Sequence, residues 1–337
     1  MSTKVTISQV ADLAEVSIAT VSRFINNSAS VKKQTAQRIM NAIKVLDYPL
    51  PSDFYSLKQS QPGRGHMITI SLPSISNPFY SDVLKGTQAA AKRHNYYTNV
   101  NVQHLDSSTL SDFMEFMEHS GSKGAIIMNA MNRELFDLLY KRMPFVQCCE
   151  FTENQTLVSY TSIDDIQASK KMTEYLISTG RTKIGFLSGP MRYKYARHRI
   201  AGYKAALEEA GISLHPEWII TLPELDFKMA VSSVQQLMTQ KEHPDALFTV
   251  SDLLAAAAIQ ASRTAGLVVP DDIFVSGFDN VDISQAVFPA ITTINLPKYQ
   301  LGYMACELLI ERLENPNVKV KKILLNAELI IRESTQK

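Results

Sequence analysis

Residues 6 to 26 bring together side chains that could recognise nucleic acid. Arg23 carries a guanidinium that can donate two hydrogen bonds to one guanine, while Ile18 and Ala19 can contact the methyl groups of thymine. Short polar side chains around them suit phosphate oxygens, namely Thr6, Ser17, Thr20, Ser22 and Asn26. The chemistry predicted for this segment is hydrogen bonding and apolar contact with a DNA duplex.

Two short helices must position these side chains. Thr6 can cap a first helix and Ser17 a second, with Glu15 and Val16 as the tight connection between them. At about 100° per residue, one side of the second helix collects the apolar residues Val21, Phe24 and Ile25. Its other side presents Ile18, Ala19, Ser22 and Arg23. One face of the second helix is therefore expected to pack against the other helices, and the opposite face is expected to be exposed to a binding partner.

A third amphipathic segment, residues 31–48, can cover this pair. It offers four apolar positions at helical spacing, Ile39, Ala42, Ile43 and Leu46. Three helices of this size predict a helix-turn-helix unit that inserts its second helix into the DNA major groove. From spacing alone, a plain helical hairpin inside a larger core is the alternative.

The composition of the whole chain limits the classes of protein to which it can belong. A length of 337 residues with 45% hydrophobic and 20% charged content is typical of a globular protein of two to three domains. No apolar run approaches the roughly 20 residues that cross a bilayer, and Met1 precedes polar residues instead of a signal-peptide core. We therefore expect a cytoplasmic protein with no membrane partner.

The cysteines and the charges add two expectations. Cys148, Cys149 and Cys306 form no C-x-x-C pair, and no histidine stands at zinc-ligand spacing, so neither a disulfide framework, a metal nor a cofactor is indicated. Residues 1–64 carry eight Lys/Arg and four Asp/Glu, a net +4 in a chain whose total is +1. These charges predict a small basic N-terminal module joined to a mildly acidic remainder of the chain.

The chain beyond the N-terminal helices divides into a linker and a large α/β region. Residues 49–66 are rich in Pro, Ser, Gly and Gln, which is typical of a linker. Later residues alternate strand-like and amphipathic helical runs, and some 270 of them exceed one comfortable sheet. We predict three parts: a headpiece (1–48), a hinge or linker (49–66) and a core of two α/β lobes (67–337). Ligands should bind between the lobes, at the carboxyl ends of the strands.

The elements expected in the core follow from these runs. Strands are predicted at 67–73, 97–102, 124–130, 144–149, 183–189, 245–251 and 273–278. Helices are predicted at 79–94, 110–119, 133–142, 166–179, 197–210, 229–240, 252–265 and 298–314.

The segment "TISQVADLAEVSIATVSRFINN" resembles the N-terminal signature of the LacI/GalR family of bacterial transcriptional regulators. Six further motifs look like family motifs in family order: "NPFYSDVLKG", "GRTKIGFLSGP", "RHRIAGYKAAL", "SGFDN", "ITTI" and "ELIIREST". The resemblance implies a small all-α helix-turn-helix headpiece joined to an α/β two-lobed core like that of periplasmic binding proteins. It also implies a repressor that binds a palindromic operator as a homodimer under the control of a small-molecule effector.

The family resemblance also assigns candidate site residues. Leu57 matches the leucine that a hinge helix wedges into the DNA minor groove, although "YPLP" and Phe54 depart from the usual hinge pattern and leave a flexible linker as the alternative. Arg199 in "RHRIAG" and Asp279 in "SGFDN" match effector-binding residues. Further candidates lie where relatives place ligand contacts: Phe79, Tyr80, Glu150, Phe227 and Ser251.

Several of these positions have a second interpretation. The segment "QCCE" stands where the family commonly has a different triplet, so Cys148 and Cys149 could simply fill a buried strand end, whereas Glu150 could touch the ligand. Phe227 could be a core residue, and Ser251 could cap the helix that follows it. The effector stays open between a sugar, a sugar phosphate and a nucleoside. "CCE", "SID" and the aromatic after Asp226 look similar to the nucleoside-responsive, cytidine-repressor branch.

Two other classes of protein were weighed against a regulator. A solute-binding protein for sugars or nucleosides would share the bilobed core, but it would lack the helix-turn-helix. An enzyme is disfavoured because the chain lacks the G-x-G-x-x-G, P-loop, G-x-S-x-G and H-E-x-x-H motifs. The chain ends at "RESTQK" without a leucine-heptad tail, so a dimer formed chiefly through the helix at 79–94 is expected instead of a tetramer.

Overall fold

The computed structural model describes residues 5–26, 31–50 and 66–336. Contacts divide the chain into two compact units, Met1–Gly65 and His66–Lys337, and each is described by itself. Within the described residues, no helix has both the length and the hydropathy required to span a bilayer.

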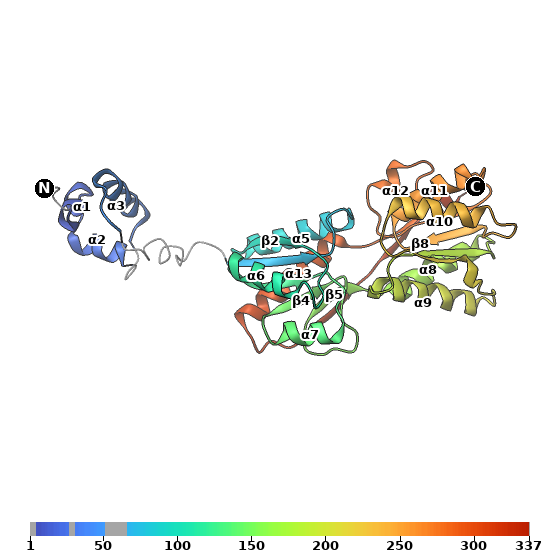
Figure 1. Cartoon of the computed structure of the whole chain (residues 1–337), viewed down its shortest axis with the longest axis horizontal. Coiled ribbons are helices and arrows are strands. Elements are labelled where there is room, and N and C mark those ends of the chain that lie inside the picture. Colours follow the sequence, from blue (N-terminus) through green and yellow to red (C-terminus); the bar gives the residue numbers. More distant parts are fainter. Residues whose placement is uncertain (1–4, 27–30, 51–65, 337) are drawn as a thin grey trace. The chain divides into compact units, whose positions relative to one another are not determined.

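Residues 5–26 and 31–50 of the N-terminal unit form three helices (Figure 1): α1 (Ile7–Leu13), α2 (Ile18–Ile25) and α3 (Lys33–Leu46). Both predicted caps are confirmed. The Gln9 backbone N–H donates to Thr6 Oγ1 at 3.5 Å, and the Thr20 N–H donates to Ser17 Oγ at 3.2 Å. The connection between α1 and α2 turns at Glu15, whose φ of 54° is left-handed.

The three helices enclose a core of their own. Its buried apolar side chains come from all three: Val10, Ala11, Ala14, Val21, Phe24, Ile25, Ile39, Ala42 and Ile43. The apolar side of α2 faces this core, so the predicted helix-turn-helix unit is confirmed. The alternative of a hairpin inside a larger core is wrong.

The second unit has two lobes (Figure 1). The first lobe is a parallel sheet in the order β11-β5-β4-β3-β1-β2 with α5, α6, α7 and α13 around it. Its elements are β1 (Met67–Leu72), α5 (Phe79–Arg93), β2 (Tyr97–Val102), α6 (Leu110–Ser120), β3 (Ser122–Ile127), α7 (Arg133–Tyr140), β4 (Phe145–Cys148), β5 (Tyr160–Ile163), α13 (Lys298–Glu314) and β11 (Lys322–Leu325).

The second lobe is a parallel sheet in the order β7-β6-β8-β9, accompanied by an antiparallel pair, β10 and β12. Its elements are α8 (Asp165–Ser178), β6 (Ile184–Ser188), α9 (Lys194–Glu209), β7 (Ile219–Thr221), α10 (Phe227–Met238), β8 (Ala246–Thr249), α11 (Asp252–Thr264), β9 (Phe274–Ser276), α12 (Ile283–Ala286), β10 (Thr293–Asn295) and β12 (Glu328–Ile330). The chain crosses between the lobes after β5, after β10 and after β11.

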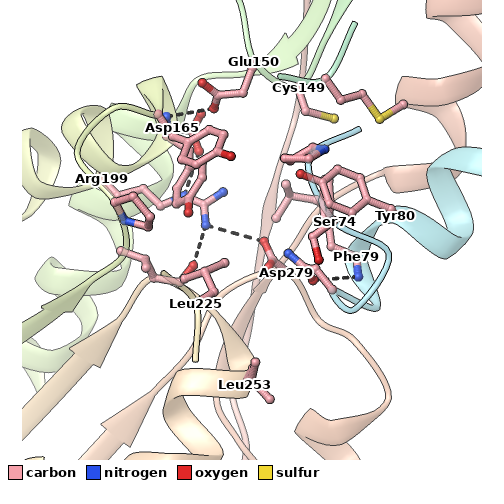
Figure 2. Close-up of a pocket in the computed structure, with 18 of the residues that line it drawn as sticks. Ser74, Phe79, Tyr80, Cys149, Glu150, Asp165, Arg199, Leu225, Leu253 and Asp279 are labelled. Carbon is pink, nitrogen blue, oxygen red and sulfur yellow. Dashed lines mark hydrogen bonds and ion pairs between the residues drawn. The ribbon is translucent and has the colours of Figure 1, made fainter. Parts of the chain in front are cut away.

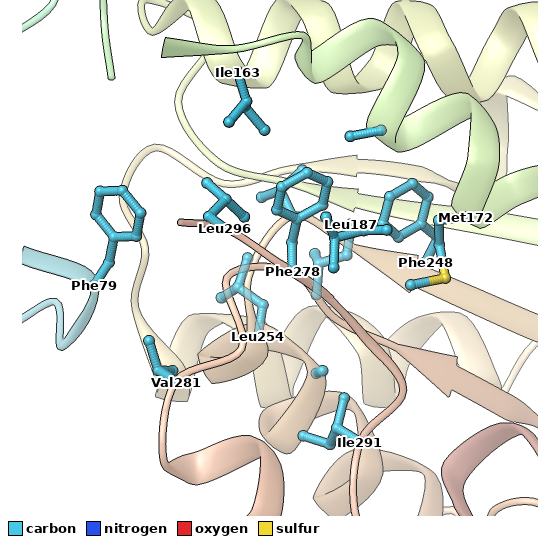
Figure 3. Packing of buried hydrophobic residues seen from close by; sticks show 14 of the residues in the cluster. Phe79, Ile163, Met172, Leu187, Phe248, Leu254, Phe278, Val281, Ile291 and Leu296 are labelled. Carbon is cyan, nitrogen blue, oxygen red and sulfur yellow. The ribbon is translucent and has the colours of Figure 1, made fainter. Parts of the chain in front are cut away.

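Three strands of the second lobe are buried along their whole length. Every residue of β6, β8 and β9 is buried, because helices cover both faces of a parallel sheet. Figure 3 shows Leu187, Phe248 and Phe278 among the side chains that fill this core. Such burial explains why these strands read as continuous apolar runs in the sequence.

All seven predicted core strands are present, but five further strands were missed. The missed strands, β5, β7, β10, β11 and β12, have only three or four residues, and β7, β11 and β12 contain no fully buried residue. The helices begin within three residues of their predicted starts. The largest shift is in α9, which begins at Lys194 instead of 197 because Glu150, far away in sequence, accepts its first backbone N–H groups.

Two glycines let α5 and α13 pack with their backbones in contact. A side chain at Gly86 would fall on the carbonyl oxygen of Tyr299, and one at Gly302 would fall on the carbonyl oxygen of Val83. A backbone carbonyl can move only if its helix moves, so these positions fix the distance between the two helices.

We expect Gly302→Ala to destabilise the core despite the better helix propensity of alanine. The clash with the Val83 backbone carbonyl cannot be relieved by a rotamer change, so it should cost about 3 kcal/mol, the upper end of the range for overpacking. This exceeds the gain of about 1 kcal/mol from replacing glycine within a helix. Urea unfolding followed by circular dichroism measures the change. Lys204→Ala, on the exposed side of α9, is the control and should change stability by less than about 0.5 kcal/mol. An unchanged midpoint for Gly302→Ala would show that the helices are further apart than described.

Candidate functional site

A cavity of about 330 Å³ lies between the two lobes of the core. Figure 2 shows Ser74, Phe79, Tyr80 and Cys149 on one side of it, and Asp165, Arg199 and Leu225 on the other. Most of the lining comes from segments that follow strands of both sheets, among them β1, β4, β5, β6, β7, β8 and β9. These are the carboxyl ends of the strands, where a ligand site was predicted.

Arg199 and Asp279 meet in this cavity. The Arg199 guanidinium donates to Asp165 Oδ1 at 2.8 Å and to the Val250 carbonyl at 2.7 Å, and it lies 3.5 Å from Asp279 Oδ1. Its charge centre is 3.5 Å from the centroid of the Phe278 ring. Arg199 is only 5% exposed, so its charge is held by hydrogen bonds and not by water.

Asp279 occupies a strained backbone position. Its φ is 100°, a region that few residues other than glycine adopt. Burial raises the pKa of its carboxyl above the ordinary value, although Arg199 and Lys298 oppose that shift. The Lys298 ammonium donates to the Asp279 and Asn280 carbonyl oxygens at 2.5 and 3.1 Å, which ties this loop to the start of α13.

Asp165 is the central acid of the site and was missed by the sequence analysis. Its carboxylate accepts from Arg199 and, at 2.5 Å, from the Lys194 ammonium, which also donates to Ser162 Oγ at 3.0 Å. Burial raises the pKa of Asp165, but Lys194 and Arg199 outweigh burial and hold it below the ordinary value. The available signal was the stretch "SIDD", which begins in the last two residues of β5, a strand too short to be predicted.

Glu150 joins the first lobe to the second. Its two carboxylate oxygens accept the backbone N–H groups of Lys194 and Tyr195, at 2.7 and 3.1 Å, at the start of α9. A carboxylate is favoured there because the N-terminus of a helix is partly positive. Burial nevertheless raises the pKa of Glu150 above its ordinary value. Cys148 is fully buried, as the strand-end interpretation of "QCCE" predicts, while Cys149 and Glu150 line the cavity, and contact of Glu150 with a ligand stays a prediction.

Aromatic side chains from both lobes line the cavity. Phe79 and Tyr80, predicted as effector contacts, begin α5 and are in the wall, and burial raises the pKa of Tyr80. Tyr193 and Tyr195 were missed; their rings stack at a centroid distance of 5.4 Å. The Tyr193 hydroxyl lies 3.3 Å from Nδ1 of His104, a contact between the lobes.

Phe227 and Ser251 are not brought to this cavity. Ser251 caps α11, where its Oγ accepts the Leu254 N–H at 3.3 Å, and Phe227 begins α10 and packs partly buried against the core. Their sequence neighbours line the wall instead: Leu225, Asp226, Val250 and Leu253. Ser251 was placed after the correct strand and Phe227 beside a lining residue, but the sequence did not show which of the adjacent side chains points inwards.

The predicted DNA-reading face of α2 is accessible. Ile18 is 49% exposed, and Ala19 and Arg23 are exposed beside it. Among the predicted phosphate contacts, Thr6, Ser17 and Asn26 are exposed, while Thr20 and Ser22 are half-buried. Leu57 lies outside the described residues. Within those residues, no group of three or more His, Cys, Asp or Glu could hold a metal ion.

Comparison with known proteins matches both units. Residues 6–50 match the model described as "Bacterial regulatory proteins, lacI family", and residues 173–335 match "Periplasmic binding protein-like domain". The ribose operon repressor of Haemophilus influenzae is 30% identical and covers 98% of each chain. The repressor CytR of Escherichia coli K12 is 30% identical, covering 99% of this chain and 97% of its own. The structure of the Lac repressor dimer bound to operator and an anti-inducer shares the fold at a TM-score of 0.79 and 22% identity, over 98% of this chain and 99% of that one.

A helix-turn-helix unit joined to a two-lobed core with an internal cavity defines a DNA-binding transcriptional regulator with an effector domain. The chain belongs to the lacI family of bacterial regulatory proteins. The resemblance found in the sequence is therefore confirmed, and the named relatives are repressors, neither enzymes nor solute-binding proteins.

Asp252, next to the cavity wall in sequence, should make the stability of the second lobe depend on pH. It is fully buried, its carboxylate accepts from Thr293 Oγ1 at 2.6 Å and from the Val281 N–H at 2.8 Å, and burial together with nearby Asp279 raises its pKa to about 7. An acid whose pKa is higher in the folded chain destabilises that chain when it is ionised. This cost is largest above pH 7 and declines as the pH falls towards the ordinary value near 4.

Asp252→Asn should therefore stabilise the protein at pH 8. An asparagine can still accept from the Val281 N–H and can donate to the Thr293 hydroxyl, so both hydrogen bonds are kept. We expect the melting temperature of the variant to exceed that of the wild type most at pH 8, with the difference shrinking steadily towards pH 4. A variant that is less stable than the wild type at pH 8 would contradict this account of Asp252.

Proposed function

We propose that this chain is a repressor whose operator affinity is controlled by a sugar or nucleoside bound between the lobes of its core. The observation that carries the proposal is the convergence of Arg199 and Asp279, distant in sequence, in a buried cavity of a chain that also has a helix-turn-helix unit. The name of the Haemophilus influenzae relative refers to a ribose operon, which supports a sugar or a sugar-containing effector.

The chain is organised in three functional parts under this proposal. Residues 1–48 read DNA, residues 49–66 act as the hinge in which Leu57 contacts the minor groove, and residues 67–337 bind effector and dimerise. Two copies present two headpieces to a palindromic operator, because half-site symmetry mirrors the two-fold axis of a dimer. DNA as the partner favours the cytoplasm as the location, and the assignment as a regulator includes no enzymatic activity.

The dimer surface would be the face of α5 that α13 leaves open. One side of α5 packs against α13 through Gly86, whereas Ser81, Lys85 and Gln88 are exposed on the other. The exposed side is polar, which suits an interface that relies on hydrogen bonds as well as on burial.

DNA recognition in the proposal centres on α2. Arg23, Ile18 and Ala19 contact base edges, and a set of short polar side chains contacts phosphates: Thr6, Ser17, Thr20, Ser22 and Asn26. Support comes from the exposure of Arg23, Ile18 and Ala19 on one side of a helix whose other side is buried.

Arg23→Ala should reduce discrimination between operator and unrelated DNA by about 1–3 kcal/mol, because a bidentate contact to guanine is lost. The measurement is a fluorescence-anisotropy titration with a palindromic operator, selected from random duplexes, and with a scrambled duplex. Lys44→Ala, an exposed cation on α3, is the control and should preserve discrimination. If Arg23→Ala weakens both duplexes equally, then Arg23 contacts only phosphate.

Effector binding in the proposal rests on Arg199 and Asp279, with Phe79, Tyr80 and Glu150 in the wall. A guanidinium and a carboxylate suit a ligand with several hydroxyl or amide groups, since a ligand lacking them would leave buried polar groups unpaired. Phe227 and Ser251 would contact the effector only if the lobes adopted another arrangement that brings these two side chains into the cavity.

Asp279→Asn should weaken effector binding by about 10- to 100-fold, because a hydrogen bond to a charged group is lost. Asparagine tolerates positive φ, and Arg199 keeps Asp165 as its partner, so the fold should persist. The measurement is the ligand-induced rise in melting temperature, with exposed Asp271→Asn as the control. A wild-type response in Asp279→Asn would remove Asp279 from the site.

A further inference from the structure

We propose that the cavity accepts an uncharged, unphosphorylated effector and rejects the phosphate esters of the same compounds. This inference rests on the proposed function, because it assumes that the ligand of the cavity is a sugar or a nucleoside. It goes beyond the proposed function because it excludes sugar phosphates, one of the three effector classes that the sequence left open.

The wall of the cavity is strongly acidic. Among the residues that line it in the described part of the chain, five carry carboxyl groups: Glu150, Asp165, Glu224, Asp226 and Asp279. Arg199 is the only lysine or arginine among them. Protonation of some of these carboxyl groups would reduce the negative charge, but it would not add a cation.

The cations near the cavity are already paired. Arg199 is bound to Asp165 and to the Val250 carbonyl, with Asp279 at 3.5 Å. Lys194, which is 1% exposed, donates to Asp165 and Ser162 and lies 4.7 Å from the centroid of the Phe151 ring.

The third nearby cation is Arg192 at the rim. Its guanidinium is paired with Glu224 at 2.6 Å. A phosphate monoester, with nearly two negative charges at neutral pH, would have to displace a carboxylate to gain any cation. Phosphate sites usually offer an uncommitted guanidinium or ammonium, or a row of backbone N–H groups.

The backbone donors at the start of α9, which could serve a phosphate, are also occupied. The N-terminus of α9 points its first N–H groups at the cavity, but Glu150 accepts those of Lys194 and Tyr195. The Glu150 carboxylate therefore occupies the position at the start of α9 where the phosphate group of a ligand would otherwise bind.

An uncharged ligand meets no such conflict. Carboxylate oxygens can accept hydrogen bonds from hydroxyl or amino groups, and the hydroxyl of Tyr80 and the amide of Asn77 add donors. The rings of Phe79, Tyr193 and Tyr195 offer apolar faces for a sugar ring or a base. This combination suits free sugars and nucleosides.

Matched pairs of compounds test the inference on the full-length protein. Thermal unfolding and calorimetry would compare ribose with ribose 5-phosphate, cytidine with cytidine 5′-monophosphate, and adenosine with adenosine 5′-monophosphate. We expect at least one free compound to bind and its ester to bind at least about 100-fold more weakly, because like charges brought together are strongly repulsive. An ester that binds as tightly as its parent, or that binds alone, overturns the inference while leaving the proposed function intact. If no compound binds, the proposed effector class fails, and the inference fails with it.

A rim variant tests whether the acidic wall causes the discrimination. Glu224→Gln removes one carboxylate and releases Arg192, so the ratio of ester to parent dissociation constants should fall by about two- to fivefold, the range expected for an exposed ion pair. Glu242→Gln removes the carboxylate of a comparable exposed pair with Lys183 outside the cavity wall and should keep the wild-type ratio. An unchanged ratio in Glu224→Gln would overturn the electrostatic basis of the proposal.

Discussion

The carboxylate of Asp165 neutralises two buried cations, and the organisation of the cleft depends on that pairing. Lys194 and Arg199 both donate to it, and all three residues are at most 5% exposed. Breaking such a buried pair by removing one partner typically costs about 3–5 kcal/mol, since the remaining charge is left without water. Asp165 stands where the chain crosses from β5 to α8, so the ion pairs are anchored at a connection between the lobes. Arg199 is thereby held in position before any ligand arrives.

The same region couples the lobes to each other. Glu150 of the first lobe accepts backbone N–H groups of α9 in the second, Lys194 of the second donates to Ser162 of the first, and His104 meets Tyr193 across the cavity. Glu153 adds hydrogen bonds to Arg197 and His198 on α9. A ligand that contacts both walls would favour one relative arrangement of the lobes by the difference in its affinity for the two states. These polar contacts stabilise one relative arrangement of the two lobes. A bound ligand must either favour that arrangement or shift the lobes to another one.

The sequence predicted the headpiece closely because its signals are local. The caps Thr6 and Ser17 and the apolar face of α2 each depend on residues a few positions apart. The cleft was harder to predict. Arg199 and Asp279 could be named from motifs, but the roles of Asp165 and Lys194 arise from contacts between segments distant in sequence. Phe227 and Ser251 are each one or two residues from a lining position, which reflects the fact that a strand end alone does not determine which neighbouring side chain turns inwards.

The central claim is that a small molecule bound in the core changes the affinity of the headpiece for DNA. The most direct test is to titrate the full-length protein with its selected operator, with and without the compound that stabilises the core. We expect the operator Kd to change by at least about fivefold in either direction, the lower range of allosteric coupling between two sites. A compound that binds the core at full occupancy but leaves the operator Kd unchanged would contradict it.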